Sequence, residues 1–274
     1  MQPFSVLMSV YKNDNPQDFR TAVESISIKQ TVQPDEVYVY VDGQVPEALS
    51  ATIRQIESEI ESVTVHWEPQ NKGLGTALQY GMLHVKHELV ARMDADDISV
   101  PDRFECQLKQ FEEDPQLSVA SGHICDFIGS IDNVVGIRKV PVGSERAKER
   151  IKVRDGLNHP AVMFRKSEVL RAGNYQDWHY NEDSYLWLRM YLAGCKFNNL
   201  DKILVYMRSG EGMYERRGGW LYFKGEEGLQ RMRWKYGIIS LPRYVLNCAI
   251  HFVVKCMMPN NVRGWVFRRL LRSH

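Results

Sequence analysis

The chain has 274 residues, of which 44% are apolar and 25% are charged, so its composition is that of a globular protein and excludes intrinsic disorder. Its formal net charge of +1 is unevenly spread, because residues 1–200 carry 21 basic and 29 acidic side chains whereas residues 201–274 carry 14 basic and 5 acidic. Five cysteines without a CxxC pair exclude a disulfide scaffold and a structural zinc site, and they indicate free thiols in a reducing cytosol.

Strand and helix patterns alternate over the first 115 residues. Residues 4–10 are apolar enough for a strand buried on both faces, and without a basic stretch before them they indicate a first strand, not a signal peptide. Further strands are expected at residues 36–41, 63–67 and 88–93, and helices from Pro16, at 46–60, at 75–85 and from residue 101. This β-α-β-α order predicts an α/β fold with a mostly parallel, doubly wound sheet.

Regular spacing fades after residue 115. Strand-like pieces are expected at residues 118–121, 134–140 and 161–164, followed by a helix at 183–193 and a late strand at 196–206. We expect these elements to complete a mixed sheet. No run of residues is apolar and long enough for a membrane-spanning helix.

Polar residues follow three of the expected strands, with Tyr11 after the first, Asp42-Gly43 after the second and an acidic cluster after the fourth. Ligands of open α/β sheets bind beyond the carboxyl ends of the strands. A glycine-containing loop, Asn71 to Gly75, follows the third strand, but its spacing matches neither a dinucleotide fingerprint nor a phosphate loop. Asp42-Gly43 and this loop suit either a nucleotide contact or an ordinary tight turn, and both interpretations stay open.

The acidic cluster Asp94-Ala95-Asp96-Asp97 is a stronger signal. Side chains two residues apart at a strand end point the same way, so Asp94 and Asp96 would converge and repel each other unless a cation lay between them. Carboxylate oxygens select Mg²⁺ or Mn²⁺, and these ions also bind diphosphate oxygens. The alternative is a capped turn before the helix that starts near Pro101.

A second acidic pair, Glu182-Asp183, precedes an amphipathic helix. Acidic residues are favoured at a helix start by the helix dipole, which is sufficient reason for such a pair. The functional interpretation is a carboxylate general base at the mouth of the site. The sequence alone leaves both open.

Taken in order, the segments FSVLMSVYKND, VYVYVDG, NKGLG, RMDADDISVPDRF, HPAVMFRKSEVLRAGNY and NEDSYLWLRMYLAG resemble a family 2 glycosyltransferase. The likeness is greatest to bacterial O-antigen and exopolysaccharide enzymes, and it covers residues 4 to 208. The resemblance implies a GT-A fold, a nucleotide-diphosphate sugar donor such as a UDP-sugar, Mn²⁺ or Mg²⁺, and inversion at the anomeric carbon. It also implies a catalytic domain at 1–208, with a nucleotide-sugar half at 1–115 and an acceptor half at 116–208, and a loop with basic helices at 209–274.

The resemblance also assigns roles to single residues. Asp183 would be the general base, with Glu182 in reserve, and Asp96 the main metal ligand at the diphosphate. Asp94 would contact the ribose or the metal. The remaining donor contacts would be Tyr11 on the base, Asp42 on a ring N–H, Asn71 and Gly73 near the nucleoside, and Arg208 with Arg216 and Arg217 closing on the diphosphate.

Two further features carry open interpretations. His159 and Trp178 would either line the acceptor site or simply pack. The segment Gln230 to Trp234 matches the QxxRW pattern of processive polysaccharide synthases, and we expect it to be helix surface in an enzyme that adds a single sugar.

The basic C-terminal part is also strongly apolar. Between Tyr244 and Met258 the polar residues Asn247, His251 and Lys255 recur every four residues, so they share one helical face and apolar residues cover the rest. After Pro259 the residues expected in a second apolar and basic segment are Trp265, Val266, Phe267, Leu270 and Leu271, among Arg263, Arg268, Arg269 and Arg272. The pattern of residues 241–274 predicts helices lying on an anionic membrane surface, with docking on the catalytic domain as the alternative.

These features together suggest a cytoplasmic enzyme held at the inner face of the cell membrane, where the resemblance implies a polyprenyl-diphosphate-linked saccharide acceptor. A nucleic-acid partner is not expected, because the wide apolar face has no use against a phosphate backbone. The competing classes are a sugar nucleotidyltransferase, a dinucleotide-dependent oxidoreductase and a non-catalytic nucleotide-binding module at the membrane surface. The first lacks its N-terminal glycine-rich loop here, and the second lacks its fingerprint.

Overall fold

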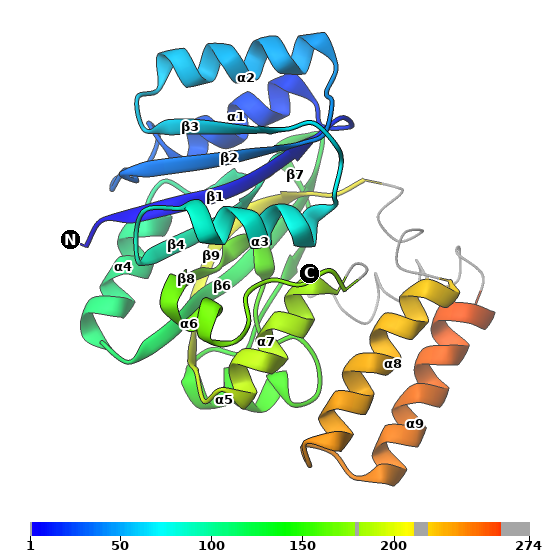
Figure 1. Ribbon diagram of the computed structural model, residues 1–274. Coiled ribbons are helices and arrows are strands. Elements are labelled where there is room, and N and C mark those ends of the chain that lie inside the picture. Colours follow the sequence, from blue (N-terminus) through cyan, green and yellow to red (C-terminus); the bar gives the residue numbers. More distant parts are fainter. Residues whose placement is uncertain (1, 179–180, 211–218, 259–274) are drawn as a thin grey trace.

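The computed structural model describes residues 2–178, 181–210 and 219–258 (Figure 1). A nine-stranded mixed sheet runs in the order β3-β2-β1-β4-β8-β6-β9-β5, and β7 pairs with β6 outside this path. The strands are β1 (Phe4–Tyr11), β2 (Glu36–Asp42), β3 (Val63–Glu68), β4 (Leu89–Asp94), β5 (Ile98–Ser99), β6 (Leu117–Ile128), β7 (Ser130–Arg138), β8 (Met163–Arg165) and β9 (Lys196–Arg208).

Helices follow most of these strands. The α-helices are α1 (Pro16–Ile26), α2 (Glu47–Glu59), α3 (Leu74–His84), α4 (Arg103–Glu113), α5 (Ser144–Ile151), α6 (Lys166–Arg171), α7 (Glu182–Leu192), α8 (Trp220–Lys235) and α9 (Leu241–Phe252). A 3-10 turn, η1 (His159–Ala161), precedes β8, and one π-helical turn, η4 (Val253–Met257), continues α9.

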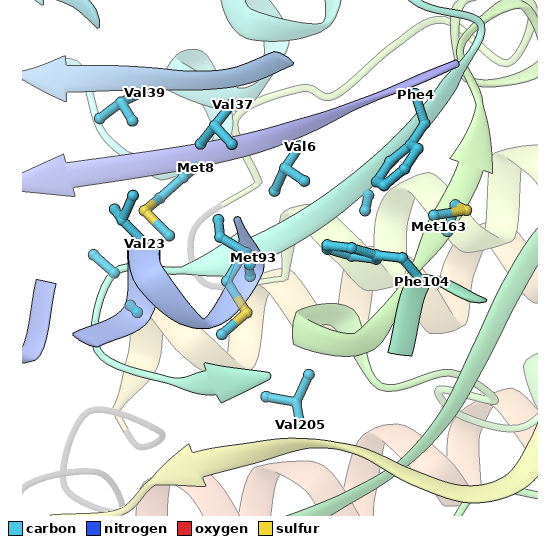
Figure 2. Packing of buried hydrophobic residues seen from close by; sticks show 14 of the residues in the cluster. Phe4, Val6, Met8, Val23, Val37, Val39, Met93, Phe104, Met163 and Val205 are labelled. Carbon is cyan, nitrogen blue, oxygen red and sulfur yellow. The ribbon is translucent and has the colours of Figure 1, made fainter. Parts of the chain in front are cut away.

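The sheet is buried on both faces. β1 sends Phe4, Val6 and Met8 to a core closed by α1, α2 and α4, and part of this core is shown in Figure 2. The opposite side chain, Leu7, belongs to a second core under α3 and α5 to α7. This alternation explains why β1 and β2 are apolar nearly throughout, since such strands have no solvent-facing side.

The parallel half confirms the expected alternation of strands and helices. β1 pairs in parallel with β2 and β4, and β2 pairs in parallel with β3. The second half is mixed, because β8 runs antiparallel to both β4 and β6 while β6 and β9 are parallel. The sequence pattern missed β5, α5 and α6. In α5 only Ala147 and Ile151 are buried, too few to produce a recognisable apolar period.

α8 and α9 form a helical hairpin beside the sheet domain (Figure 1). The expectation that Gln230 to Trp234 is helix surface is wrong for two of its residues. Gln230 and Arg233 are buried, because Gln230 accepts a hydrogen bond from Asn247 of α9 and Arg233 faces the backbone of α5 at Ile151. Trp234 is exposed and stacks on Tyr244. None of the helices in the described segments has the length and apolar character needed to cross a membrane.

Candidate active site

The three polar strand ends meet at one edge of the sheet. The register places Tyr11 of β1 opposite Asp42 of β2, and Ser9 opposite Asp94 of β4. Asp14 follows in the turn after β1 and accepts a hydrogen bond from the backbone N–H of Tyr11 at 2.8 Å. Burial raises the pKa of Asp14 to about 7, with smaller contributions from Asp96 and Asp94. A carboxyl group that the sequence did not single out therefore belongs to this edge.

Asp42 organises the loop at Asn71 and Gly73. Its Oδ1 accepts the backbone N–H of Lys72 at 2.7 Å, and its Oδ2 accepts the Asn71 side chain and the Gly73 N–H, each at 2.9 Å. A Cβ on Gly43, which has a φ of +86°, would lie 2.6 Å from the Asn71 nitrogen, so glycine is needed there. The predicted Asp42, Asn71 and Gly73 are thus brought together, and the Asp42 carboxylate already has three partners within the protein.

The second strand-end carboxylate, Asp94, is held by a buried arginine. Arg92 lies two residues earlier on the same side of β4 and is 3% exposed, and both of its terminal nitrogens contact the Asp94 carboxylate. Burial and then the Asp94 charge raise the pKa of Asp96 to about 6. Asp94 therefore faces a guanidinium, while Asp96 keeps an unfavourable negative charge close to it.

Arg208 connects the end of β9 to this acidic cluster. Its backbone N–H donates to Asp97 Oδ1 at 2.9 Å, its Nε donates to the Asp96 carbonyl at 3.2 Å, and its guanidinium pairs with Asp18 at 2.8 Å. Asp97 is 1% exposed, and burial raises its pKa well above the ordinary value. The predicted Arg208 thus lies beside Asp96.

Asp183 sits in the first turn of α7, where its Oδ1 accepts the Ser184 N–H at 2.7 Å. Ser184 in turn donates its hydroxyl to Asp155 at 2.6 Å. Burial, followed by the charges of Asp155 and Glu182, raises the pKa of Asp183 to about 8. Burial also raises the pKa of Glu182. These carboxyl groups hold protons more tightly than exposed ones, as general bases and acids in active sites do.

His159 is a buried side chain next to Asp183. It is 7% exposed, its Nε2 is 2.8 Å from the Tyr175 hydroxyl and its Nδ1 is 4.0 Å from Asp183 Oδ2. Burial lowers the His159 pKa and raises that of Tyr175, so both groups are neutral. The 4.0 Å from Nδ1 to Asp183 is too long for a hydrogen bond, so the imidazole can act on this carboxyl group only as a nearby dipole. His159 therefore lies beside Asp183, while Trp178 packs on Tyr185 and donates to the Gly225 carbonyl of α8.

Arg92 acts on two sets of acidic side chains, one at the end of β4 and one at the start of α7. Its charge lowers the pKa values of Asp96 and Asp97 near the end of β4, and it also lowers those of Glu182 and Asp183 at the start of α7. The sequence pattern missed this residue, although a basic side chain inside the apolar strand LVARMD was the available signal. The strand-end and helix-start carboxylates thus form one site.

The donor set at Asp96 fits a divalent cation in part. Asp96 offers a hard carboxylate oxygen whose repulsion from Asp94 a cation would relieve. In the described ranges, no three His, Cys, Asp or Glu side chains converge as a ready metal site. Because Mg²⁺ and Mn²⁺ in such sites take one or two carboxylates together with phosphate oxygens and waters, Asp96 with Asp94 is a sufficient protein contribution.

Two surface cavities lie at opposite ends of the sheet. One of about 350 Å³ lies beside Asp42 at the ends of β2 and β3, and Gly43, Trp67 and Glu68 line it. A larger one of about 530 Å³ lies at the opposite end of the sheet, where β6 and β9 begin, lined by Ser118 and Lys196 among others. Of these two cavities, the smaller is the one that adjoins the site residues.

Comparison with known proteins identifies the family. The model of glycosyl transferase family 2 matches residues 5–170, more than half of the chain. The chain belongs to glycosyl transferase family 2. It is therefore a glycosyltransferase, and the sugar nucleotidyltransferase and oxidoreductase alternatives do not hold.

Relatives of this glycosyltransferase include bacterial enzymes named for amylovoran and O-antigen biosynthesis. It is 34% identical over 98% of its length and 96% of the relative to an Escherichia coli UDP-Gal:alpha-D-GlcNAc-diphosphoundecaprenol beta-1,3-galactosyltransferase. It is 35% identical over 97% of its length and 98% of the relative to AmsE of Erwinia amylovora, an amylovoran biosynthesis glycosyltransferase. The resemblance to bacterial O-antigen and exopolysaccharide enzymes is thereby confirmed.

Solved structures confirm the GT-A fold. Staphylococcus aureus TarS 1-349 in complex with UDP-GlcNAc superposes with a TM-score of 0.64 at 16% identity, covering 97% of this glycosyltransferase and 75% of that chain. The mannosyltransferase PcManGT of Pyrobaculum calidifontis in complex with GDP-Man and Mn²⁺ gives 0.62 at 13% identity, covering 96% and 72%. Of the predicted residues, Arg216 and Arg217 and the segment after Pro259 lie outside the described residues.

Proposed function

We propose that this glycosyltransferase moves a sugar from a UDP-sugar to a lipid-linked saccharide with inversion at the anomeric carbon. The observation that carries the proposal is the meeting of two carboxylate groups around Arg92, one at the end of β4 and one at the start of α7. The galactosyltransferase relative, whose name includes UDP-Gal and a diphosphoundecaprenol-linked sugar, supports this donor and acceptor class.

The donor would bind along the edge formed by β1, β2 and β4. Tyr11 packs against the base, and the loop that Asp42 holds brings Asn71 and Gly73 to the nucleoside. The lone pairs of Asp42 not used by this loop accept a ring N–H, since a carboxylate has roughly four acceptor positions. Asp94 reaches the ribose or shares the cation.

Asp96, together with Asp94, would hold Mn²⁺ or Mg²⁺ at the diphosphate. When bound, the cation supplies Lewis-acid stabilisation of the departing nucleoside diphosphate. Arg208 adds positive charge at the same place, because its Nε already lies on the Asp96 carbonyl. The Mn²⁺ and GDP-Man named with the structure of the mannosyltransferase support this cation class.

Asp183 would act as the general base, with Glu182 beside it. It removes the proton of the acceptor hydroxyl while that oxygen forms the new bond to the anomeric carbon. The bond from the anomeric carbon to the phosphate oxygen breaks, and the electron pair leaves with the nucleoside diphosphate. One displacement inverts the carbon, and no protein nucleophile is needed. General base catalysis of this kind contributes roughly 10²–10⁴-fold.

The acceptor would be a polyprenyl-diphosphate-linked saccharide, which places the reaction at the inner face of the cell membrane. Residues 241–274 would contact that surface, as their apolar and basic pattern indicates.

The test is transfer by the purified full-length chain. UDP-galactose, UDP-glucose, UDP-GlcNAc and GDP-mannose are each offered with a synthetic GlcNAc-diphosphate lipid, with and without Mn²⁺. We expect release of UDP together with a product of inverted anomeric configuration, measured by NMR. A retained anomeric configuration in the product would contradict the single displacement.

A further inference from the structure

In the α8–α9 hairpin the two helices pack through polar side chains, whereas surface helices ordinarily pack through their apolar faces. The polar face of α9 points at α8. Asn247 donates to Gln230 at 2.8 Å, His251 Nδ1 lies 3.9 Å from Glu226, and the Lys255 ammonium lies 4.3 Å from the centre of the Tyr222 ring. Lys255 is only 6% exposed. The polar residues that the sequence places on one face are therefore used for packing.

The apolar face of α9 and of the π-helical turn η4 that continues it is consequently exposed to solvent. Leu246, Ile250, Val253 and Met257 are 50%, 51%, 48% and 66% exposed, and their spacing of four, three and four residues makes one continuous stripe. Further large side chains of the hairpin that are at least 40% exposed are Trp220, Leu221, Trp234, Tyr236, Leu241, Val245 and Phe252. Scattered apolar residues are normal on a surface, but a contiguous apolar patch of this kind marks a contact with a partner.

The exposed charged side chains of the hairpin are all basic. Its exposed ionic side chains are the basic Lys224, Arg231, Lys235 and Arg243, and of these Arg231 is paired with Glu227 of the same helix. The two acidic residues between positions 219 and 258 turn toward α9, with Glu227 accepting from the Tyr244 hydroxyl at 2.5 Å and Glu226 near His251. No exposed acidic side chain remains in that described stretch. A second copy of this surface would bring like charges together, whereas an anionic surface complements them.

We propose that this outward face of α8 and α9, called the docking face below, lies on a bilayer of anionic phospholipids. The Leu246–Met257 stripe enters the boundary between headgroups and acyl chains, and the basic side chains bind the anionic headgroups. The docking face therefore includes α8, which the pattern of residues 241–274 did not indicate. The inference rests on the proposed function in one respect, because it brings the catalytic edge to a lipid-linked acceptor.

The experiment is co-sedimentation of the full chain with vesicles of phosphatidylcholine alone or mixed with phosphatidylglycerol. We expect binding to the mixed vesicles that the double variant Leu246→Glu, Ile250→Glu weakens at least about tenfold, since two large apolar side chains no longer leave water. The matched control is Leu83→Glu on α3, where the side chain is 58% exposed, and it should bind as the wild type does. Lys235→Gln and Arg243→Gln should each cost about fivefold.

Three outcomes would overturn the proposal. Undiminished binding of the double variant would assign the membrane contact to another segment. Equal binding to both vesicle types would show that anionic headgroups do not contribute to the contact. A wild type that is dimeric in sedimentation and becomes monomeric in the double variant would make the face an interface between copies. Transfer to a short water-soluble acceptor is measured alongside, and its retention in the double variant separates failure of docking from failure of the proposed chemistry.

Discussion

The catalytic edge, where β1, β2 and β4 end, and the docking face both depart from the rule that apolar side chains are buried and charged ones exposed. They depart from it in opposite directions. At the edge, charged and titratable groups are buried, as Arg92 at 3% and Asp97 at 1% exposure show. On the docking face, Leu246 and Met257 are at least half exposed. Buried charges are costly unless paired, and an exposed apolar stripe is equally unfavourable in water. The raised pKa values of Asp96 and Asp183 and the exposed apolar stripe are not explained by folding alone, so both regions indicate a binding partner.

The two regions differ in what the partner must supply. The edge already pairs its charges internally, with Asp94 on Arg92 and Asp183 on the first turn of α7. What remains unbalanced is the raised pKa of Asp96 and of Asp183, and a bound cation would lower that of Asp96. The docking face has no internal partner for its stripe and requires an apolar surface. Perturbing the edge should therefore change chemistry, and perturbing the docking face should change location.

The largest effect is expected from Asp183→Asn. The variant keeps the shape of the side chain and loses the base, so the transfer rate should fall by about 10²–10⁴-fold while donor affinity changes little. Transfer is measured by UDP release and affinity by titration calorimetry. Glu182→Gln is the matched comparison and should lose much less. The reverse order of the two losses would make Glu182 the base.

Asp96→Asn should weaken cation-dependent donor binding by about 10–100-fold, because the carboxylate that meets the cation is neutralised. The measurement is titration of UDP with and without Mn²⁺, and Asp132→Asn on the exposed strand β7 serves as the control. An Asp96→Asn protein whose affinity responds to Mn²⁺ as the wild type does would place the cation elsewhere.

His159→Gln should displace the pH profile of kcat/KM. Activity rises with pH as the base ionises, so the acid limb should lie near the Asp183 pKa of about 8. The imidazole Nδ1 lies 4.0 Å from Asp183 Oδ2, so losing its dipole should destabilise the carboxylate and raise the Asp183 pKa. The limb then moves to higher pH and the rate on its acid side falls, by about tenfold for each pH unit that the limb moves. His159→Asn keeps an N–H at the Nδ1 position and should restore the limb. Equal profiles for both variants would leave His159 a packing residue only.

The smallest effect concerns stability. The folded pKa of Asp183, about 8, exceeds its ordinary value of 3.8, so the folded state binds this proton more tightly and loses stability as pH rises between the two values. Asp183→Asn should therefore raise the melting temperature at pH 8 by about 3–6 °C, the change that about 1–2 kcal/mol gives at this size. Below pH 4 the two proteins should melt together. A variant that is less stable at pH 8 would show that the ionised carboxylate is favoured in the fold.

Much of the fold was predictable because its strands are strongly apolar. β1 and β2 have no exposed face, so their apolar runs ended where Tyr11 and Asp42 begin the site. The sequence also located Asp94, Asp96 and Asp183, since each lies at an element's end. Their partners were not predictable. Whether Asp94 faces a cation or Arg92 depends on which groups the sheet brings together, and no local spacing encodes that.

The C-terminal helix shows the same limit. Asn247, His251 and Lys255 share one face, as the spacing predicted. The spacing could not tell which face meets α8, because a helix packs on its polar side when the neighbour offers matching groups such as Gln230 and Glu226. The burial of Gln230 and Arg233 follows from that same packing.

The most direct measurement is the structure of the enzyme with a UDP-sugar and Mn²⁺. The account predicts the cation between the diphosphate and Asp96, and an acceptor-side opening in which Asp183 lies within about 3 Å, or one bridging water, of where the acceptor hydroxyl attacks. A diphosphate bound away from Asp96, or an anomeric carbon whose open face looks away from Asp183, would contradict it.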